Sequence, residues 1–170
     1  APGEDVAHAV RREVLEETGF RVGEVRCHYS QPWLVPNSRM TGCTDWTEFQ
    51  GTSSTRKILG GFGNVEDNVL KFPDGEVKAA AFRSFSEKSR TWAIWWLDGR
   101  SPHHLDVPVI GNFAGSVGTF IANDSLDGKP ITVRFTWHAN PGANPVWEQA
   151  FSRDDGKTWE ANWVMEFVRQ

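Results

Sequence analysis

Residues 158–167 read TWEANWVMEF, and their alternation decides the fold class expected for this chain. Successive side chains of an extended strand point to opposite faces, so every second residue shares a face. One face of this stretch is apolar and comprises Trp159, Ala161, Trp163, Met165 and Phe167. The other face is mostly polar and comprises Glu160, Asn162, Val164 and Glu166. The pattern predicts a β-strand with one buried face.

Two neighbouring stretches repeat the pattern. In VRFTWH (133–138) and WEQAF (147–151), large apolar residues alternate with polar or small ones. If these three strands are neighbours, four polar side chains meet on one face, namely Arg134, Glu148, Asn162 and Glu166. Such a face is either a solvated outer wall with ion pairs or the polar lining of a cavity, and the sequence leaves both open.

From Cys43 onward, short β-rich runs follow one another with turn signals such as Gly60-Gly61 and Asp127-Gly128 between them. The expected strands cover 44–51, 54–60, 63–72, 77–86, 91–98, 108–114, 117–123, 131–138, 146–152 and 158–168. Many short strands at this spacing indicate a sandwich or a barrel. Hairpins in sequence are the simplest connection, so we expect an antiparallel β-barrel.

The first part of the chain has a different composition and hydrophobic periodicity. Residues 4–18 have helical apolar spacing and stop at Gly19, residues 20–30 have strand composition, and a proline-containing loop follows. Eight of the nine tryptophans lie after residue 40. We therefore divide the chain into residues 1–41 and residues 42–170.

Composition excludes some classes of function. A net charge of −4 lacks the basic excess of a nucleic-acid binder, and no apolar run is long enough for a membrane-spanning helix. No signal peptide is visible. Cys27 and Cys43 form no metal-ligand spacing and are expected to be free thiols of a cytoplasmic protein, with a disulfide between them as the alternative.

The predicted helix carries three glutamates that suit a divalent cation. Glu13, Glu16 and Glu17 are three and four residues apart, so they share one helical face. Mg²⁺ and Mn²⁺ prefer such oxygen ligands. The alternative is a solvated helix face without a metal.

This segment resembles the Nudix box. RREVLEETGF and the upstream glutamate match its pattern at Glu4, Arg12, Glu13, Val14, Glu16, Glu17, Gly19 and Phe20. The following SQPWLVPNSRM resembles the segment that marks the NADH pyrophosphatase branch, with departures at Leu34, Val35 and Arg39. The resemblance implies a Mg²⁺- or Mn²⁺-dependent diphosphate hydrolase in which Glu13, Glu16 and Glu17 are the catalytic, metal-binding residues.

The body of the chain resembles a different family. GCTDWTEFQG, TWAIWWLDGRSPHHLD and WEQAFSRDDGKTWEANWVMEF are similar to a bacterial family of unknown function with a lipocalin-like β-barrel. The resemblance implies a mainly β fold, an antiparallel lipocalin-like (calycin-type) barrel with one N-terminal α-helix. Residues 20–41 would then supply its first strand.

Polar and aromatic residues of the body are candidates for a ligand site. The stretch WWLDGRSPHHLD brings Trp95, Trp96, Asp98, Arg100 and His104 close together, and Trp137 and Trp163 provide stacking surfaces. The set expected to bind a ligand is Trp95, Trp96, Asp98, Arg100, His104, Arg134, Trp137, Glu148, Asn162 and Trp163. A loop fixed by Asp–Arg pairing and an aromatic core are the alternatives. The stretch SRDDGKTW (152–159) predicts a hairpin-stabilising turn.

Three functions remain open. The first is binding of a small apolar or aromatic molecule in the barrel, without a cofactor and with or without hydrolytic activity in the cavity. The second is the Nudix-type hydrolase, which would need Mg²⁺ or Mn²⁺. The third is a recombined chain without selected activity. The sequence also leaves an oligomer open.

Overall fold

The computed structural model describes residues 21–29, 46–140 and 142–169, and these residues form ten β-strands. The strands are β1 (Arg21–Tyr29), β2 (Thr47–Ile58), β3 (Gly63–Phe72), β4 (Gly75–Ser86), β5 (Thr91–Asp98), β6 (Val109–Ala114), β7 (Val117–Leu126), β8 (Lys129–His138), β9 (Val146–Ser152) and β10 (Glu160–Arg169).

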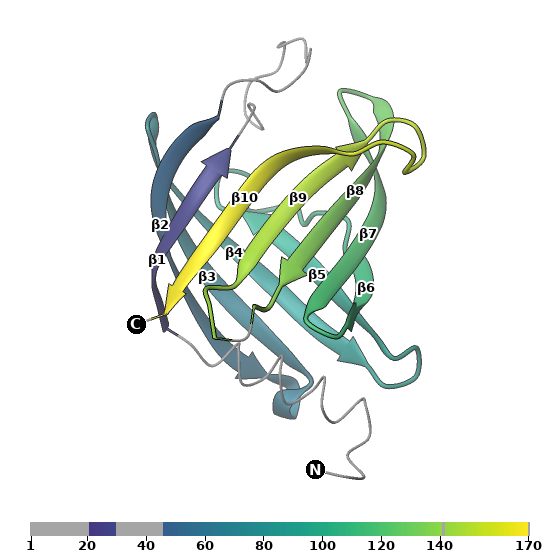
Figure 1. Ribbon diagram of the computed structural model, residues 1–170, viewed down its shortest axis with the longest axis horizontal. Helices are drawn as coiled ribbons and strands as arrows, with labels where there is room; N and C mark the ends of the chain where they lie inside the picture. The colour runs from purple at the N-terminus through teal and green to yellow at the C-terminus, as the bar shows by residue number, and fades with distance from the viewer. Residues whose placement is uncertain (1–20, 30–45, 141, 170) are drawn as a thin grey trace.

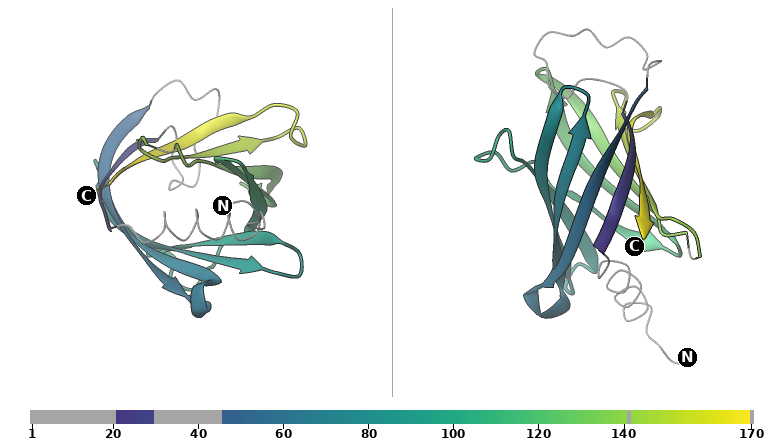
Figure 2. Two further views of the ribbon diagram at one scale, coloured as in Figure 1. Left: turned by 60° about the horizontal axis from the view of Figure 1, so that its bottom comes forward. Right: turned by 90° about the vertical axis from the view of Figure 1, so that its left-hand side faces the viewer.

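Strands β2 to β10 form one strongly curled antiparallel sheet in which each strand pairs with the next along the chain (Figure 1). Strand β1 pairs with both β2 and β10 and thereby closes the sheet. Figure 2 shows the ring of strands from two further directions. The expected mainly β, antiparallel architecture is confirmed.

The strand boundaries follow the sequence pattern closely, with one error. Strands β3, β5 and β9 have the expected limits, but the expected strands 44–51 and 54–60 are one strand, β2. The first of these two strands was expected to end at Gly51. In the structure Gly51 pairs with Leu70, and an added Cβ would lie 2.7 Å from the Val69 carbonyl oxygen. The glycine therefore permits a close approach of β2 and β3 instead of ending a strand.

The inward side chains pack in two aromatic clusters. One contains Phe49, Leu70, Trp147, Trp163, Met165 and Phe167, and the other contains Trp92, Ile94, Val109, Phe120, Ile131, Val133 and Phe151. Phe135 and Trp137 pack against both clusters. The faces expected for 147–151 and for Trp163, Met165 and Phe167 are therefore confirmed as inward faces. Trp159 was expected on the same face, but its ring lies against the Arg134 guanidinium instead.

Strand β10 is irregular at its start, where its register against β9 shifts between Ala161 and Trp163. A bulge of this kind turns a side chain away from the face that simple alternation assigns to it. Asn162 is accordingly buried, with 3% of its surface exposed. The prediction that Asn162 shares a face of β10 with Val164 and Glu166 is wrong for this reason.

The expected helix over residues 4–18 lies outside the described residues. Within them, the helical content is a single 3-10 turn, Leu59–Gly61. No helix in the described part of the chain is long and apolar enough to cross a membrane.

Candidate functional site

Five polar side chains line the inner wall of the sheet across three neighbouring strands. We call them the polar belt: Ser53 of β2, Asn64, Glu66 and Asn68 of β3, and Arg83 of β4. The three residues of β3 are two apart, so they share the inward face with buried Leu70. At most 3% of the surface of Ser53, Asn64, Glu66 or Asn68 is exposed.

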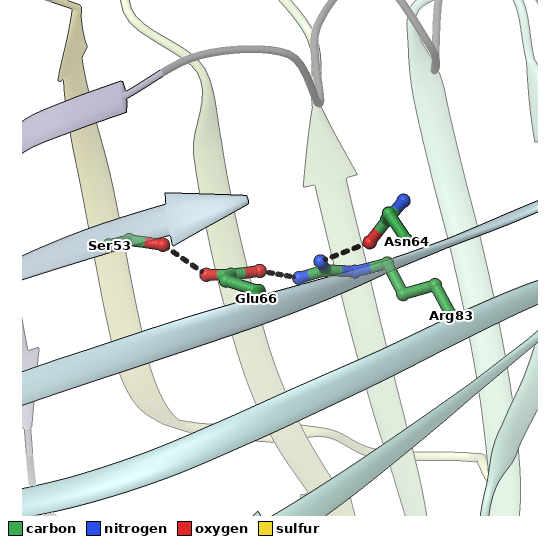
Figure 3. Close-up of polar contacts among 4 residues, drawn as sticks. All are labelled: Ser53, Asn64, Glu66 and Arg83. Atoms are coloured by element: carbon green, nitrogen blue, oxygen red, sulfur yellow. Dashed lines mark hydrogen bonds and ion pairs between the residues drawn. The ribbon is translucent and has the colours of Figure 1, made fainter. Parts of the chain in front are cut away.

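Hydrogen bonds and an ion pair connect four of these residues in a row (Figure 3). The Ser53 hydroxyl donates to Glu66 Oε1 at 2.7 Å, and Glu66 Oε2 is paired with the Arg83 guanidinium. Arg83 Nη1 donates to Asn64 Oδ1 at 3.0 Å. Trp137, from β8 across the barrel, places its ring 5.5 Å from the guanidinium carbon. The positive charge is thus held by a carboxylate, an amide oxygen and an aromatic face.

Several buried polar atoms of the interior have no hydrogen-bond partner. They are Asn64 Nδ2, both Nδ2 and Oδ1 of Asn68, Arg83 Nε and Trp92 Nε1. Because Asn64 Oδ1 accepts from Arg83, its amide nitrogen points away from the guanidinium (Figure 3). An unpaired buried polar group costs about 1–3 kcal/mol of stability. A barrel interior that encloses five such atoms is suited to a polar partner.

The neighbours of Asn68 on both adjacent strands are small. Ser53 of β2 and Ala79 of β4 are its direct partners in register, and Ala81 is the partner of Glu66. Both alanines are buried. The wall around Asn68 and Glu66 is therefore built from short side chains, whereas the rest of the interior is built from aromatic and large aliphatic ones.

The predicted cluster after β5 is a loop fixed by one aspartate. Asp98 accepts hydrogen bonds from the backbone nitrogen and Nε of Arg100, both at 2.8 Å. Burial alone would raise the pKa of Asp98, but the hydrogen bonds and charge of Arg100 outweigh it and lower the pKa. This arrangement corresponds to the Asp–Arg loop that the sequence left open as an alternative.

The other polar residues of this loop are less enclosed. His103 and His104 are exposed. Burial raises the pKa of Asp106 to about 6, with His104 opposing the shift and Asp124 and Asp98 adding to it. Among the described residues, no three His, Cys, Asp or Glu side chains are placed to hold a metal ion.

The four predicted ligand tryptophans separate into two groups. Trp96 and Trp163 pack edge to face inside the barrel, with ring centroids 6.0 Å apart, and Trp137 stacks on Phe167 at 5.2 Å. Trp95 lies between the buried Ile94 and the inward Trp96, on the opposite face of β5. Three of the four therefore belong to the interior, together with the polar belt.

Of the four polar residues of β8, β9 and β10 that alternation placed on one face, three share the outward face and Asn162 does not. Arg134 and Glu148 form an ion pair of 3.6 Å on the outer wall, where Trp159 lies 4.2 Å from the guanidinium carbon. Glu166 accepts a hydrogen bond from Asn144 at 2.7 Å. Asn162 instead accepts one from Gln149 Nε2 at 2.9 Å in the buried layer.

The stretch SRDDGKTW forms the predicted turn between β9 and β10. Asp154 Oδ1 accepts from the Thr158 backbone nitrogen at 2.8 Å, and Oδ2 accepts from the Thr158 hydroxyl at 2.7 Å. The Ser152 hydroxyl donates to Asp154 Oδ1 at 2.8 Å. These bonds hold the pKa of Asp154 down at about 2.

The polar belt was not among the expected site residues, although the sequence of β3 carries a signal for it. In GNVEDNVL (63–70), polar residues occupy Asn64, Glu66 and Asn68, and the alternate positions are Val65, Asp67 and Val69. A face with three consecutive polar positions normally meets solvent. Here that face continues into buried Leu70, which is the one residue that reveals its inward direction.

Known proteins match only a part of this chain. No family model matches the chain, so the resemblance of residues 42–169 to a lipocalin-like family gains no support. The human NAD-capped RNA hydrolase NUDT12 is 55% identical over 42 residues, which is 25% of this chain and 9% of that protein. The NAD-capped RNA hydrolase NudC of Actinobacillus succinogenes is 52% identical over 40 residues, 24% of this chain and 15% of that protein.

A third relative matches over a longer stretch. Nudix hydrolase 19, chloroplastic, of Arabidopsis thaliana is 38% identical over 92 residues, 54% of this chain and 21% of that protein. The chain therefore spans between 9% and 21% of the length of these curated relatives. These findings show a partial relationship to Nudix hydrolases.

Proposed function

We propose first that the segment with the Nudix-box pattern provides a metal-dependent hydrolase site for a nucleoside diphosphate such as NADH. The observation that carries this proposal is the 55% identity over 42 residues to a protein named as an NAD-capped RNA hydrolase. The length suits the stretch from Glu4 to Met40, which holds the pattern residues.

The donor set of this segment fits the metal. Glu13, Glu16 and Glu17, which lie outside the described residues, offer the carboxylate oxygens that Mg²⁺ and Mn²⁺ prefer. A bound divalent cation neutralises diphosphate charge and lowers the pKa of a bound water. The three carboxylates would hold the cation in position. Because their negative charges repel one another and the diphosphate, substrate binding at this site would need the cation.

The test is hydrolysis of NADH and a panel of nucleoside diphosphates, with Mn²⁺ or with a chelator. We expect Mn²⁺-dependent turnover by the full chain and a loss of at least about a hundredfold in Glu17→Gln, since removing one charged ligand impairs the metal. Glu76→Gln, at an exposed carboxylate of β4, is the matched control and should keep the activity. Turnover that Glu17→Gln retains, or none in the parent chain, contradicts the proposal.

The second proposed function is binding of a small molecule inside a lipocalin-like (calycin-type) barrel. The comparisons favour the first function over this one, but the described geometry favours the second. Its support is the group of buried, unpartnered polar atoms on Asn64, Asn68, Arg83 and Trp92 within an aromatic interior. A barrel of ten strands also has a wider interior than the eight-strand barrels that hold one small ligand.

Tryptophan fluorescence tests this second function directly. Trp92 and Trp163 are buried in the interior, so an aromatic probe that enters should change their emission in a saturable way. A chain that shows neither Mn²⁺-dependent turnover nor saturable probe binding would correspond to the third possibility, a recombined protein without selected activity.

A further inference from the structure

We propose that the polar belt recognises a neutral aromatic molecule that carries an amide-type edge, and that Asn68 is the recognising residue. The proposal deepens the second function above and rests on it. It concerns the chemical class of ligand that the barrel interior selects.

Asn68 defines the hydrogen-bonding pattern of the ligand. Its side chain is 1% exposed, and both its amide nitrogen and its amide oxygen lack partners. Exchanging the two atoms by rotating the amide leaves both unpaired, so the observation does not depend on the assigned orientation. A group with one acceptor and one N–H donor side by side satisfies both atoms at once. Carboxamides, lactams and the edges of many heteroaromatic rings have this pattern.

The remaining unpartnered atoms around the belt are donors. Asn64 Nδ2, Arg83 Nε and Trp92 Nε1 all carry hydrogen and are buried without an acceptor. A ligand with further acceptor atoms, such as ring nitrogens or carbonyl oxygens, would satisfy them. The belt is therefore better suited to an acceptor-rich molecule than to a plain hydrocarbon.

The charges of the belt cancel. Glu66 and Arg83 form an ion pair with 4% and 11% of their side chains exposed, so the belt has no net charge to offer a ligand. A carboxylate ligand would bring an uncompensated charge into the interior, which is strongly unfavourable. The favoured ligand is therefore neutral.

The surroundings determine the body of the ligand. The side chains next to the Asn68 amide are short: Ser53 and Ala79 flank Asn68, and Ala81 flanks Glu66. Beyond them the interior is lined by indole rings, including Trp92, Trp96 and Trp137. A flat ring packs well against such surfaces, and its edge then meets the asparagine.

Three probes of similar size, benzamide, benzoate and toluene, separate the contributions of the amide edge, the charge and the aromatic ring. Benzamide has the neutral amide edge. Benzoate has acceptor oxygens and a negative charge but no N–H donor, and toluene has no hydrogen-bonding group and no charge. We expect isothermal titration and tryptophan fluorescence to give a benzamide affinity at least about tenfold above those of the other two, because one satisfied buried pair is worth that much.

The variant Asn68→Leu tests the recognising residue. Leucine has nearly the same size but no polar atoms, so the melting temperature should rise while benzamide affinity falls to that of toluene. A rise in melting temperature separates loss of the site from loss of the fold, and Asn68→Val repeats the test if leucine does not fit. Asn123→Leu, at an exposed asparagine of β7, is the matched control and should leave benzamide binding unchanged.

The outcomes distinguish this inference from the function on which it rests. Equal binding of toluene and benzamide, or unchanged benzamide affinity in Asn68→Leu, would overturn the role of Asn68 while barrel binding stands. No binding of any probe would overturn both, and would assign the unpaired atoms to enclosed water. Neither outcome bears on the diphosphate hydrolase, whose test uses Glu17.

Discussion

Glu66 and Arg83, on the neighbouring strands β3 and β4, form an ion pair inside the barrel with 4% and 11% of their side chains exposed. The pair connects Ser53 on one side with Asn64 on the other. Because each charge is removed from solvent, each depends on the other. This dependence makes the pair the most sensitive point of the polar belt.

Glu66→Leu should destabilise the protein strongly. It leaves the Arg83 charge buried without its carboxylate, and breaking a buried pair in this way costs about 3–5 kcal/mol. Urea denaturation followed by tryptophan fluorescence measures the free energy of unfolding. The double variant Glu66→Leu, Arg83→Met should recover most of the loss, since it removes both charges. If the single variant loses under about 1 kcal/mol, the pair is hydrated in solution and not buried.

The turn aspartate Asp154 should stabilise the protein in a pH-dependent way. Hydrogen bonds from Thr158 and Ser152 lower its pKa from 3.8 to about 2. A lowered carboxyl pKa contributes stability that is fully present above about pH 4 and is lost as the pH falls through 2. The melting-temperature difference between the parent chain and Asp154→Ala should therefore be constant above pH 4 and shrink below it. Asp155→Asn, at the adjacent exposed position, is the matched control variant.

Asp106 should have the opposite pH dependence. Burial raises its pKa to about 6, so its protonated form is favoured in the folded protein. The contribution to stability is fully present below about pH 4 and is lost as the pH rises through 6. Asp106→Asn should therefore melt at a higher temperature than the parent chain at pH 7.5, with no difference at pH 4. A higher melting temperature at both pH values would point to a cause other than titration, and the exposed Asp67→Asn provides the baseline.

Gly111→Ala should weaken the pairing of β6 with β7. A Cβ at this position would lie 1.8 Å from the Thr119 carbonyl oxygen and 2.7 Å from the Phe120 Cα, and both are backbone atoms. The strands must separate to accept it, which costs on the order of 3 kcal/mol or more. Ala114→Ser, at an exposed position of the same strand, should change the free energy of unfolding by under about 0.5 kcal/mol. An unfolding curve of Gly111→Ala that matches the parent chain would mean that β6 lies further from β7.

Much of the fold was accessible from local patterns. The limits of β3, β5 and β9 followed from apolar runs bounded by turn residues, and the turn at Asp154 followed from its side-chain spacing. Gly51 was misread because a glycine that ends a strand and a glycine that allows two strands to approach look alike in sequence. The interior tryptophans Trp96, Trp137 and Trp163 were among the expected site residues, but their polar partners were not.

The sequence by itself determined that the body alternates between two kinds of face, because a strand has a side-chain period of two. Only the tertiary structure decided which faces point inward. Three polar residues in alternation, such as Asn64, Glu66 and Asn68, are typical of a solvent face, yet the curled sheet buries them on the same face as Leu70. Asn162 likewise left its expected face at a bulge that depends on the register with β9. Pairing between strands sets the direction of a face and the position of a bulge, and pairing is a property of the closed sheet rather than of any single strand.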